Sequence, residues 1–331
     1  MQPGVAFRAS QLFHRNPGGD QPCRHNNILI VTKFPGIGQY SDGHSDKRAF
    51  HWQIRNWERD SDNQENSMAF LAKGKILVAA ALAVFAMATG AQAASCGKNG
   101  AGFEAWKQEF AAEAKAEGVG SRGLAALAGA TYATRTISVD RGIHKAFSGS
   151  VEDFMKRRGG SAIISRGRAL KKSNAALFAK IEGTYGVSPG VLLAIWGMET
   201  GFGSAMGNQN TVSAILTLAY DCRRPEFFHP HAIAALKLVD RGALTASSVG
   251  AAHGEIGHTQ FLPGNVLKYG VGSGNLRDKS TALASTANFL KAHGWQGGAS
   301  AQANIGAIAG WNDASVYQQA IVRIATAIDA N

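Results

Sequence analysis

The chain has 331 residues, of which 34 are Lys or Arg and 23 are Asp or Glu, giving a formal net charge of +11. This length allows one large domain or two ordinary ones. The basic balance suits an anionic partner. Nucleic acid is not the partner we expect, because the chain has no nucleic-acid-binding motif and does carry an export signal.

The first part of the chain reads differently from the rest. Residues 1–67 are rich in Arg, His, Asn, Gly and Asp and show no sustained apolar period. From Met68 onward, two lysines precede a short apolar run over 76–87, which is followed by the A-x-A pattern at 91–93. This is the pattern of a secretory signal peptide. The alternative, a transmembrane anchor, wants roughly 20 apolar residues.

A signal peptide is read at the start of a nascent chain, so we expect translation to begin at Met68. Residues 1–67 are then a spurious upstream extension or, alternatively, a disordered leader. The signal occupies 68–93, and the mature domain covers 94–331. That domain holds 24 Lys and Arg against 16 Asp and Glu, a net charge of +8, which suits an anionic cell wall.

Two cysteines, Cys96 and Cys222, remain after processing. An even number in an oxidising compartment favours a disulfide between them. Two free buried thiols are one alternative. A lipid-modified Cys96 is another, although Ala93 matches poorly the Leu-like residue that a lipidation site has three positions earlier.

The apolar spacing along the mature chain is mainly helical. Residues 131–140 contain β-branched side chains and are predicted to be extended. The fold class we expect is an α-rich α+β domain with a minor β component. Helices are predicted over Phe103–Val119, Ser121–Ala130, Ser161–Tyr185, 188–201, Thr211–Ala219, Pro230–Val239, Thr259–Leu267, Ser280–Ala292 and Asp313–Ala327.

The helix over 188–201 carries the strongest chemical signal. Ser188 is a suitable N-cap followed by proline, the body is nearly all apolar, and Gly201 is a natural stop. Glu199 lies at its C-terminal end. Burial and the negative end of the helix dipole both disfavour a charged carboxylate there, so we expect a raised pKa that suits a general acid. An ordinary helix-end glutamate in solvent is the alternative.

Five segments decide between these interpretations. Together they resemble the B-type membrane-bound lytic murein transglycosylases, in the right order and from about Cys96 to the C-terminus. The segments are GVLLAIWGMETGFG (190–203), LTLAYDCRRPEFF (216–228), GEIGHTQFLPGN (254–265), ALASTANFLKAHGW (282–295) and GWNDASVYQQAI (310–321).

The resemblance implies a lysozyme-like fold and cleavage of the MurNAc–GlcNAc β-1,4 bond of peptidoglycan without water. Glu199 matches the single catalytic acid and base, which closes a 1,6-anhydro ring on muramic acid. Most glycosidases pair two carboxyl groups. Ring closure by the substrate's own hydroxyl needs only one, provided that dipoles stabilise the cationic transition state.

Further roles follow residue by residue from the same resemblance. Gln260 and Asn312 match polar contacts to the sugar near the scissile bond, and Tyr317 matches an aromatic residue close to the catalytic glutamate. Asn312 has an alternative role as a cap of the last helix.

Arg223 and Arg224 match a pair that meets the peptide or lactyl carboxylates of the substrate, and we expect Phe227 and Phe261 to wall the cleft. The alternatives are that Arg223 pairs with an acid such as Glu226 and that Phe261 belongs to the core.

The sequence departs from the family pattern in two places: Ala251 replaces a common Ser, and Glu255 replaces a small residue. Some relatives carry a calcium loop, but Gly270–Asp278 has too few carboxylates for one. We therefore expect no metal and no cofactor. The expected partner is the peptidoglycan glycan strand, and the protein is expected to be a monomer.

Three rival functions stay open at this stage. A hydrolytic lysozyme would use Glu255 as the second carboxylate. A zinc-dependent hydrolase would need ligands among His229, His231, His253 and His258, but these lack a metal-binding helix spacing. A non-catalytic wall-binding protein would not need an acid at a buried helix end.

The mature protein is predicted to begin near Ala94, because the A-x-A pattern ends at Ala93. N-terminal sequencing of periplasmic material tests this prediction. A natural start upstream of Met68 would refute the interpretation of residues 1–67 as spurious.

Overall fold

The computed structural model describes residues 95–142 and 147–330. The predicted leader (1–67) and signal peptide (68–93) lie outside these residues. Among the described residues, no helix has the length and apolar character needed to cross a membrane.

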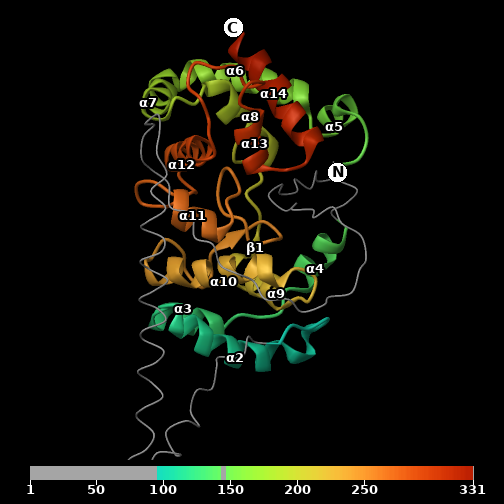
Figure 1. The fold of residues 1–331 in the computed structure, drawn as a ribbon, viewed down its shortest axis with the longest axis vertical. Coiled ribbons are helices and arrows are strands. Elements are labelled where there is room, and N and C mark those ends of the chain that lie inside the picture. Colours follow the sequence, from blue (N-terminus) through green and yellow to red (C-terminus); the bar gives the residue numbers. More distant parts are fainter. Residues whose placement is uncertain (1–94, 143–146, 331) are drawn as a thin grey trace, which may run out of the picture. The chain divides into compact units, whose positions relative to one another are not determined.

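The described residues are mainly helical, as the sequence predicts, with one short pair of strands (Figure 1). The elements are η2 (Gly100–Gly102), α2 (Phe103–Ala116), α3 (Ser121–Ala128), α4 (Thr134–Arg141), α5 (Val151–Arg157), α6 (Gly160–Ser173), α7 (Ala175–Tyr185), α8 (Pro189–Thr200), β1 (Gln209–Asn210), α9 (Thr211–Tyr220), α10 (Pro225–Asp240), β2 (Val249–Gly250), α11 (Pro263–Tyr269), α12 (Lys279–Ala292), α13 (Ile305–Trp311) and α14 (Ser315–Asp329).

Helix α8 is the central element of one group of helices. Its residues from Gly190 to Thr200 are all buried, and it packs against α6, α7, α12 and α14 (Figure 1). Ser188 is its N-cap residue but makes no capping bond with its side chain. Instead, the backbone N–H of Gly190 donates to Asp329 Oδ1 at the end of α14, at 3.0 Å. The last helix of the chain thus fixes the start of the helix that carries Glu199.

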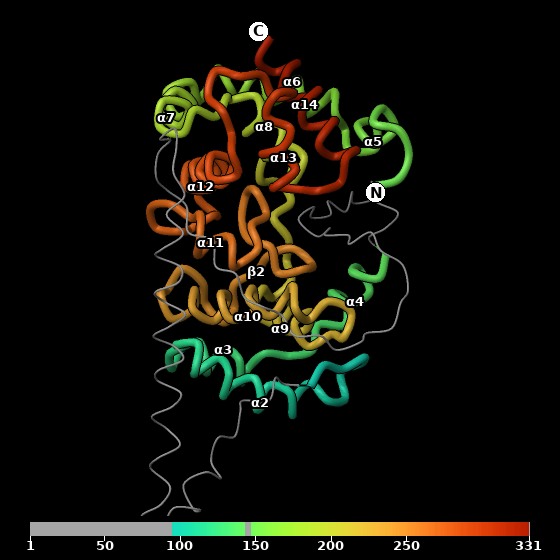
Figure 2. Tube along the Cα trace, viewed as in Figure 1, coloured from blue at the N-terminus to red at the C-terminus, as the bar shows by residue number. Residues whose placement is uncertain are grey.

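A second group of helices surrounds α10, which packs against α3, α9 and α11 (Figure 2). On α2, the side chains Phe103, Trp106, Phe110 and Ala114 are buried, as their spacing predicts. Asp240 at the end of α10 accepts hydrogen bonds from the backbone N–H groups of Gly120 and Gly123, at 2.6 and 2.8 Å. These bonds hold the first turn of α3 against α10.

The expectation that residues 131–140 are extended is wrong, because Thr134–Arg141 forms α4. Thr136 and Asp140 lie one turn apart and are both buried, and α4 packs against α9. Three ionic partners of Asp140 come from segments far along the chain: Arg223, Arg224 and His253. Such tertiary contacts override the weak preference of β-branched residues for strands.

The single helix expected over Ser161–Tyr185 is also wrong, because the chain breaks at Asn174 between α6 and α7. The Asn174 side chain donates to the Leu170 carbonyl at 3.0 Å, a local bond that competes with helix continuation. Two other boundaries shift as well. The helix expected from Thr259 begins only at Pro263, and the one expected from Pro230 begins at Pro225. The sequence analysis missed α5 and α13.

The strands pair antiparallel, with Gln209 opposite Gly250 and Asn210 opposite Val249. They fix the start of the loop that contains Gln260. That loop closes on itself, because Ile256 and Phe261 exchange backbone hydrogen bonds at 2.8 and 3.1 Å. Gln260 itself has a φ of 59°, a left-handed conformation that non-glycine residues adopt mainly at constrained sites.

The predicted disulfide between Cys96 and Cys222 is confirmed, with its two α-carbons 4.9 Å apart. Backbone bonds reinforce the link: Gly97 N–H donates to the Tyr220 carbonyl at 2.9 Å, and Cys222 N–H donates to the Gly97 carbonyl at 3.2 Å. The first described residues are therefore fastened to the segment that follows α9.

Replacing both cysteines with serine should lower the free energy of unfolding by roughly 5 kcal/mol, the chain-entropy value for a separation of 126 residues. Urea denaturation with and without reductant measures this. Reduction should bring the wild type down to the stability of the double variant and leave that variant unchanged. A wild type whose unfolding midpoint ignores reductant would contradict the prediction.

Candidate active site

The carboxyl group of Glu199 lies inside the protein, with the residue only 1% exposed at the end of α8. Two donors from the C-terminal segment meet the same oxygen. Tyr317 OH donates to Glu199 Oε1 at 2.8 Å, and Trp311 Nε1–H donates to it at 3.2 Å. The expectation of an aromatic residue close to the glutamate is thus met by Tyr317. Burial disfavours the charged carboxylate whereas the donors favour it, so the raised pKa of Glu199 stays a prediction.

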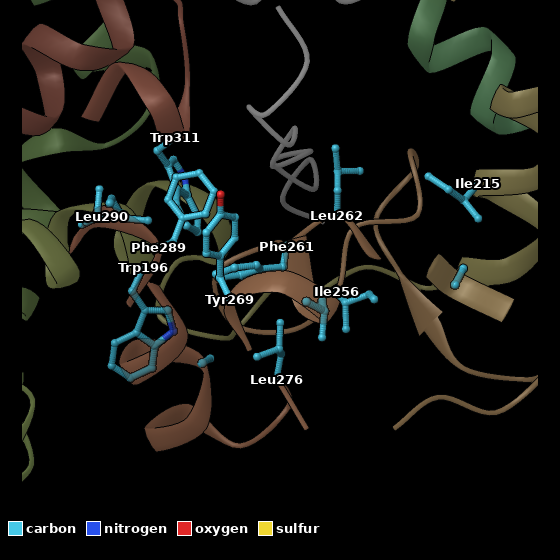
Figure 3. Close-up of a cluster of buried hydrophobic side chains, with 14 of the residues drawn as sticks. Trp196, Ile215, Ile256, Phe261, Leu262, Tyr269, Leu276, Phe289, Leu290 and Trp311 are labelled. Carbon is cyan, nitrogen blue, oxygen red and sulfur yellow. The ribbon is translucent and has the colours of Figure 1, made fainter. Parts of the chain in front are cut away.

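Trp311 is the site residue that the sequence analysis missed. Its signal was present, because it directly precedes Asn312 in the segment that also contains Tyr317. The indole packs edge-to-face against Phe261 and Phe289, each with ring centroids 5.0 Å away (Figure 3). Phe261 is entirely buried. Its expected place on the cleft wall is therefore wrong and the core alternative is right: Phe261 supports Trp311.

A pocket of about 150 Å³ lies next to this group. Trp311 lines the pocket and also donates to Glu199, so the pocket and the Glu199 carboxyl group share this side chain as a neighbour. The volume is below the ~300 Å³ of common ligand pockets, which fits one part of a longer ligand. The lining residues are Phe227, His231, Leu262, Asn265, Phe289, His293, Ala309, Gly310, Trp311, Asn312 and Asp313.

Phe227 and Asn312 are therefore the predicted substrate residues that line this pocket. Asn312 Oδ1 also accepts from the Ala314 backbone N–H at 2.9 Å. The alternative that Asn312 caps the last helix is wrong, because the N-cap residue of α14 is Ala314. Burial lowers the pKa of His231, another lining residue, to about 4. His231 is consequently neutral at pH 7, and its Nδ1 accepts from Gly264 N–H at 3.1 Å.

Gln260 is buried, and its side-chain amide donates to the Gly257 carbonyl at 2.8 Å. The loop that holds it is tied to the end of α8. Thr200 Oγ1 donates to the His258 carbonyl at 2.6 Å, and Trp196 Nε1–H donates to His258 Nδ1 at 3.1 Å. These bonds fix the Glu199 turn and the Gln260 loop relative to each other.

A second group of charged residues surrounds Asp140, at the end of α4. We call it the Asp140 cluster. Its members are Asp140, Arg141, Asp221, Arg223, Arg224, His253 and Glu255. The predicted pair Arg223 and Arg224 belongs to it, and both arginines contact Asp140. Arg223 therefore does pair with an acid, as the alternative proposed, but that acid is Asp140 in place of Glu226.

Inside the cluster, His253 lies between two carboxylates. Its Nδ1 is 3.4 Å from Glu255 Oε1, and its Nε2 is 3.4 Å from Asp140 Oδ1. Burial alone would lower the pKa of His253, but Glu255 and Asp140 outweigh burial and raise it to about 9. Burial would conversely raise the pKa of Asp140, yet the bond with His253 and the charges of Arg224 and Arg223 lower it.

The four histidines of the zinc alternative have separate partners. His229 pairs with Glu113, His231 with Gly264, His253 with the Asp140 cluster and His258 with Trp196. The part of the chain that the structure describes contains no group of three or more His, Cys, Asp or Glu residues placed to hold a metal ion.

Residues 102–307 match the family model described as the transglycosylase SLT domain. Over 118 residues the chain is 36% identical to membrane-bound lytic murein transglycosylase B of Escherichia coli (strain K12). That alignment covers 34% of this chain and 33% of the relative, so it spans one third of the relative's length.

Solved structures show the same architecture. SltB3 from Pseudomonas aeruginosa, in complex with NAG-anhNAM-pentapeptide, has a TM-score of 0.63 and 26% identity, covering 69% of this chain and 80% of that chain. The Escherichia coli lytic transglycosylase Slt35 in complex with calcium has a TM-score of 0.61 and 19% identity, covering 72% and 96%. The latter likeness concerns the fold alone.

The raised pKa of His253 predicts a pH-dependent stability. The pKa of His253 is about 9 in the folded protein and 6.5 ordinarily. The stabilisation of the fold by protonated His253 is therefore fully present below about pH 6.5 and is lost as the pH rises through about 9. The shift corresponds to roughly 3 kcal/mol. Urea unfolding of the wild type from pH 6 to pH 10 measures it.

Glu255→Gln is the matched comparison, since it removes the carboxylate that contributes most to raising the pKa of His253. Its loss of stability between pH 6.5 and 9 should be smaller than that of the wild type. Parallel curves for the two proteins would show that the His253–Glu255 pair does not produce the effect.

Proposed function

We propose that this chain, which belongs to the transglycosylase SLT domain family, is a lytic transglycosylase of peptidoglycan with Glu199 as its catalytic acid and base. The observation that carries the proposal is the buried Glu199 carboxyl, whose Oε1 accepts from both Tyr317 and Trp311. The relatives support it too, because one is named a lytic murein transglycosylase and another was crystallised with an anhydro-muropeptide.

The two donors assign separate tasks to the two carboxyl oxygens. When Glu199 is protonated, the oxygen that accepts from Tyr317 OH and Trp311 N–H is the carbonyl oxygen of its carboxyl group. The transferable proton is then carried on Oε2. The donors also prevent rotation of the carboxyl group, so Oε2 keeps one orientation for both proton transfers.

The reaction proceeds in two proton transfers. Glu199 first gives its proton to the glycosidic oxygen, and the bond from that oxygen to C1 of the muramic acid residue breaks. Glu199, now a carboxylate beside an oxocarbenium-like sugar, next takes the proton of the C6 hydroxyl as that oxygen bonds to C1. The proton count of the enzyme is restored, no water is consumed, and the product is a 1,6-anhydro sugar.

The hydrolytic alternative would use Glu255 as a second carboxylate. Glu255 is fully buried and is committed to His253, through its Oε2 to the backbone N–H at 3.0 Å and through its Oε1 to the ring. A carboxylate held in this way by an internal cation is a poor activator of water. The geometry therefore favours the one-carboxyl mechanism.

The proposed substrate contacts follow from the pocket and the Asp140 cluster. Asn312 and Phe227, which line the pocket, are assigned to the glycan strand together with Gln260. Arg223 and Arg224 are assigned to substrate carboxylates, to which a guanidinium binds in a bidentate manner. We place the enzyme in the periplasm on the basis of its signal-like segment and its substrate. We also propose that it acts as a monomer.

Glu199→Gln should abolish release of anhydro-muropeptides while leaving folding and glycan binding nearly intact. Glutamine still accepts from Tyr317 and Trp311 but can neither give nor take a proton. General acid–base catalysis is typically worth about 10²–10⁴-fold, and one group performs both transfers here, so the loss should reach the upper end. Mass spectrometry of products from purified sacculi measures it, and thermal unfolding checks the fold.

Two comparison variants complete this experiment. Glu182→Gln, on the exposed surface of α7, should release anhydro-muropeptides at the wild-type rate. Glu255→Gln should still yield the anhydro sugar and no reducing-end muramic acid. If Glu255→Gln abolishes cleavage while Glu199→Gln spares it, the one-carboxyl mechanism is wrong.

A further inference from the structure

We propose that Asp140 is a positioning residue that gathers Arg141, Arg223 and Arg224 into one carboxylate-binding surface, in which Arg141 is a third binding residue. The inference rests on the proposed function, which supplies a substrate whose stem peptides bear carboxylates, as do its lactyl groups wherever the peptide has been removed. Neither Asp140 nor Arg141 stood out in the sequence, because each is brought to the arginine pair only by folding.

Asp140 uses both oxygens to hold the three arginines. Its Oδ1 is 2.5 Å from Arg224 Nη2, and its Oδ2 contacts Arg223 Nη2. Arg141 Nη1 lies 3.3 Å from Oδ2, and Arg141 Nη2 donates to Asp221 Oδ2 at 2.7 Å. One carboxylate thus faces three guanidinium groups, an arrangement in which Asp140 alone cannot balance the positive charge.

The charges are sorted by depth. The side chains of Asp140, Asp221, His253 and Glu255 are all between 0% and 3% exposed, whereas those of Arg141, Arg223 and Arg224 are 43%, 27% and 25% exposed. Solvent, or a ligand, therefore meets only guanidinium groups, while their counter-charges are buried behind them. An anion reaching this surface encounters no exposed carboxylate of the cluster.

The cluster also has an excess of positive charge. With His253 protonated, which its pKa of about 9 ensures at neutral pH, four cations stand against three carboxylates. One anionic ligand group neutralises the cluster. Guanidinium groups bind carboxylates in a bidentate manner, so a substrate carboxylate is the chemistry that the surface fits.

The backbone of Arg223 is fixed independently of Asp140. Arg223 directly follows the disulfide-bonded Cys222, and its backbone N–H donates to Asp221 Oδ1 at 2.9 Å. Such fixing lowers the entropy lost when a ligand binds. The remaining freedom is in the long side chains, and the Asp140 carboxylate restricts it.

The surface is next to the pocket that carries the glycan contacts. The Arg224 guanidinium lies 6.0 Å from the ring centre of Phe227 and 5.1 Å from that of Phe228, and Phe227 lines the pocket beside Trp311. A peptidoglycan strand bound in the pocket thus has its carboxylates within reach of the cluster. This adjacency is what a merely structural ion cluster would not require.

Binding and turnover of the full chain test the proposal. A soluble disaccharide-pentapeptide is titrated calorimetrically, and KM and kcat are measured on peptide-bearing strands and on amidase-treated strands that keep only the lactyl carboxylate. Arg141→Gln should raise Kd and KM about tenfold, the loss of one charge-assisted hydrogen bond, with kcat within about twofold. Arg141→Lys should recover part of the loss.

Asp140→Asn should show the same change in KM without a matching change in kcat. The control is Asp240→Asn. This change weakens the hydrogen bonds that hold the first turn of α3, so it should lower stability without raising KM. If Asp140→Asn does not fold, Arg141→Gln still tests the proposal, because it changes an exposed side chain. A KM effect confined to peptide-bearing strands assigns the site to peptide carboxylates. An effect confined to amidase-treated strands assigns it to the lactyl carboxylate, which amidase frees from its amide bond, and an effect on both substrates shows that the surface binds either carboxylate.

Unchanged Kd and KM in Arg141→Gln, or a loss of kcat alone, would overturn the proposal. The proposed function has its own readout in the same experiment. A wild type that releases no anhydro-muropeptide refutes the function. The calorimetric Kd of the disaccharide-pentapeptide for the wild type and its variants still reports whether Arg141 binds a carboxylate and whether Asp140 positions the arginines for it.

Discussion

A carboxyl group at the end of a wholly buried helix is the constraint around which this domain is organised. Glu199 follows a run of apolar residues in α8, and four other helices pack around that helix. A carboxyl group buried in this way requires hydrogen-bond partners. Tyr317 and Trp311 supply them from a segment more than a hundred residues away. The C-terminal helices are therefore part of the site and not only of its support.

The same requirement explains the packing around the donors. Phe261 and Phe289 pack edge-to-face against the indole of Trp311 and help to hold it where it donates to Glu199. Phe261 belongs to the loop that also carries Gln260, and that loop is bonded to the end of α8 through Thr200 and His258. The acid, its donors and the polar loop are thus held by one continuous set of contacts, which leaves little freedom for any of them to shift alone.

The Asp140 cluster follows a different rule, because its buried carboxylates are compensated mainly by full positive charges. Three buried carboxylates are tolerable only because three arginines and a protonated His253 face them. The departure of Glu255 from the family pattern has its explanation here: Glu255 is the partner that keeps His253 charged. The arrangement leaves the carboxylates inside and the guanidinium groups outside.

The sequence by itself determined the helical elements with strong periodicity, the apolar helix ending in Glu199, the disulfide and the segment containing Tyr317. The helices and the two segments are local patterns, and the disulfide concerns a residue type with only one possible partner after processing. The tertiary structure alone decided that Thr134–Arg141 is helical, that Phe261 is core and Trp311 a donor, and that Arg223 meets Asp140. Each of these depends on contacts between residues far apart in the chain, which spacing and propensity do not contain, because burial and ion pairing are set by whichever element packs opposite.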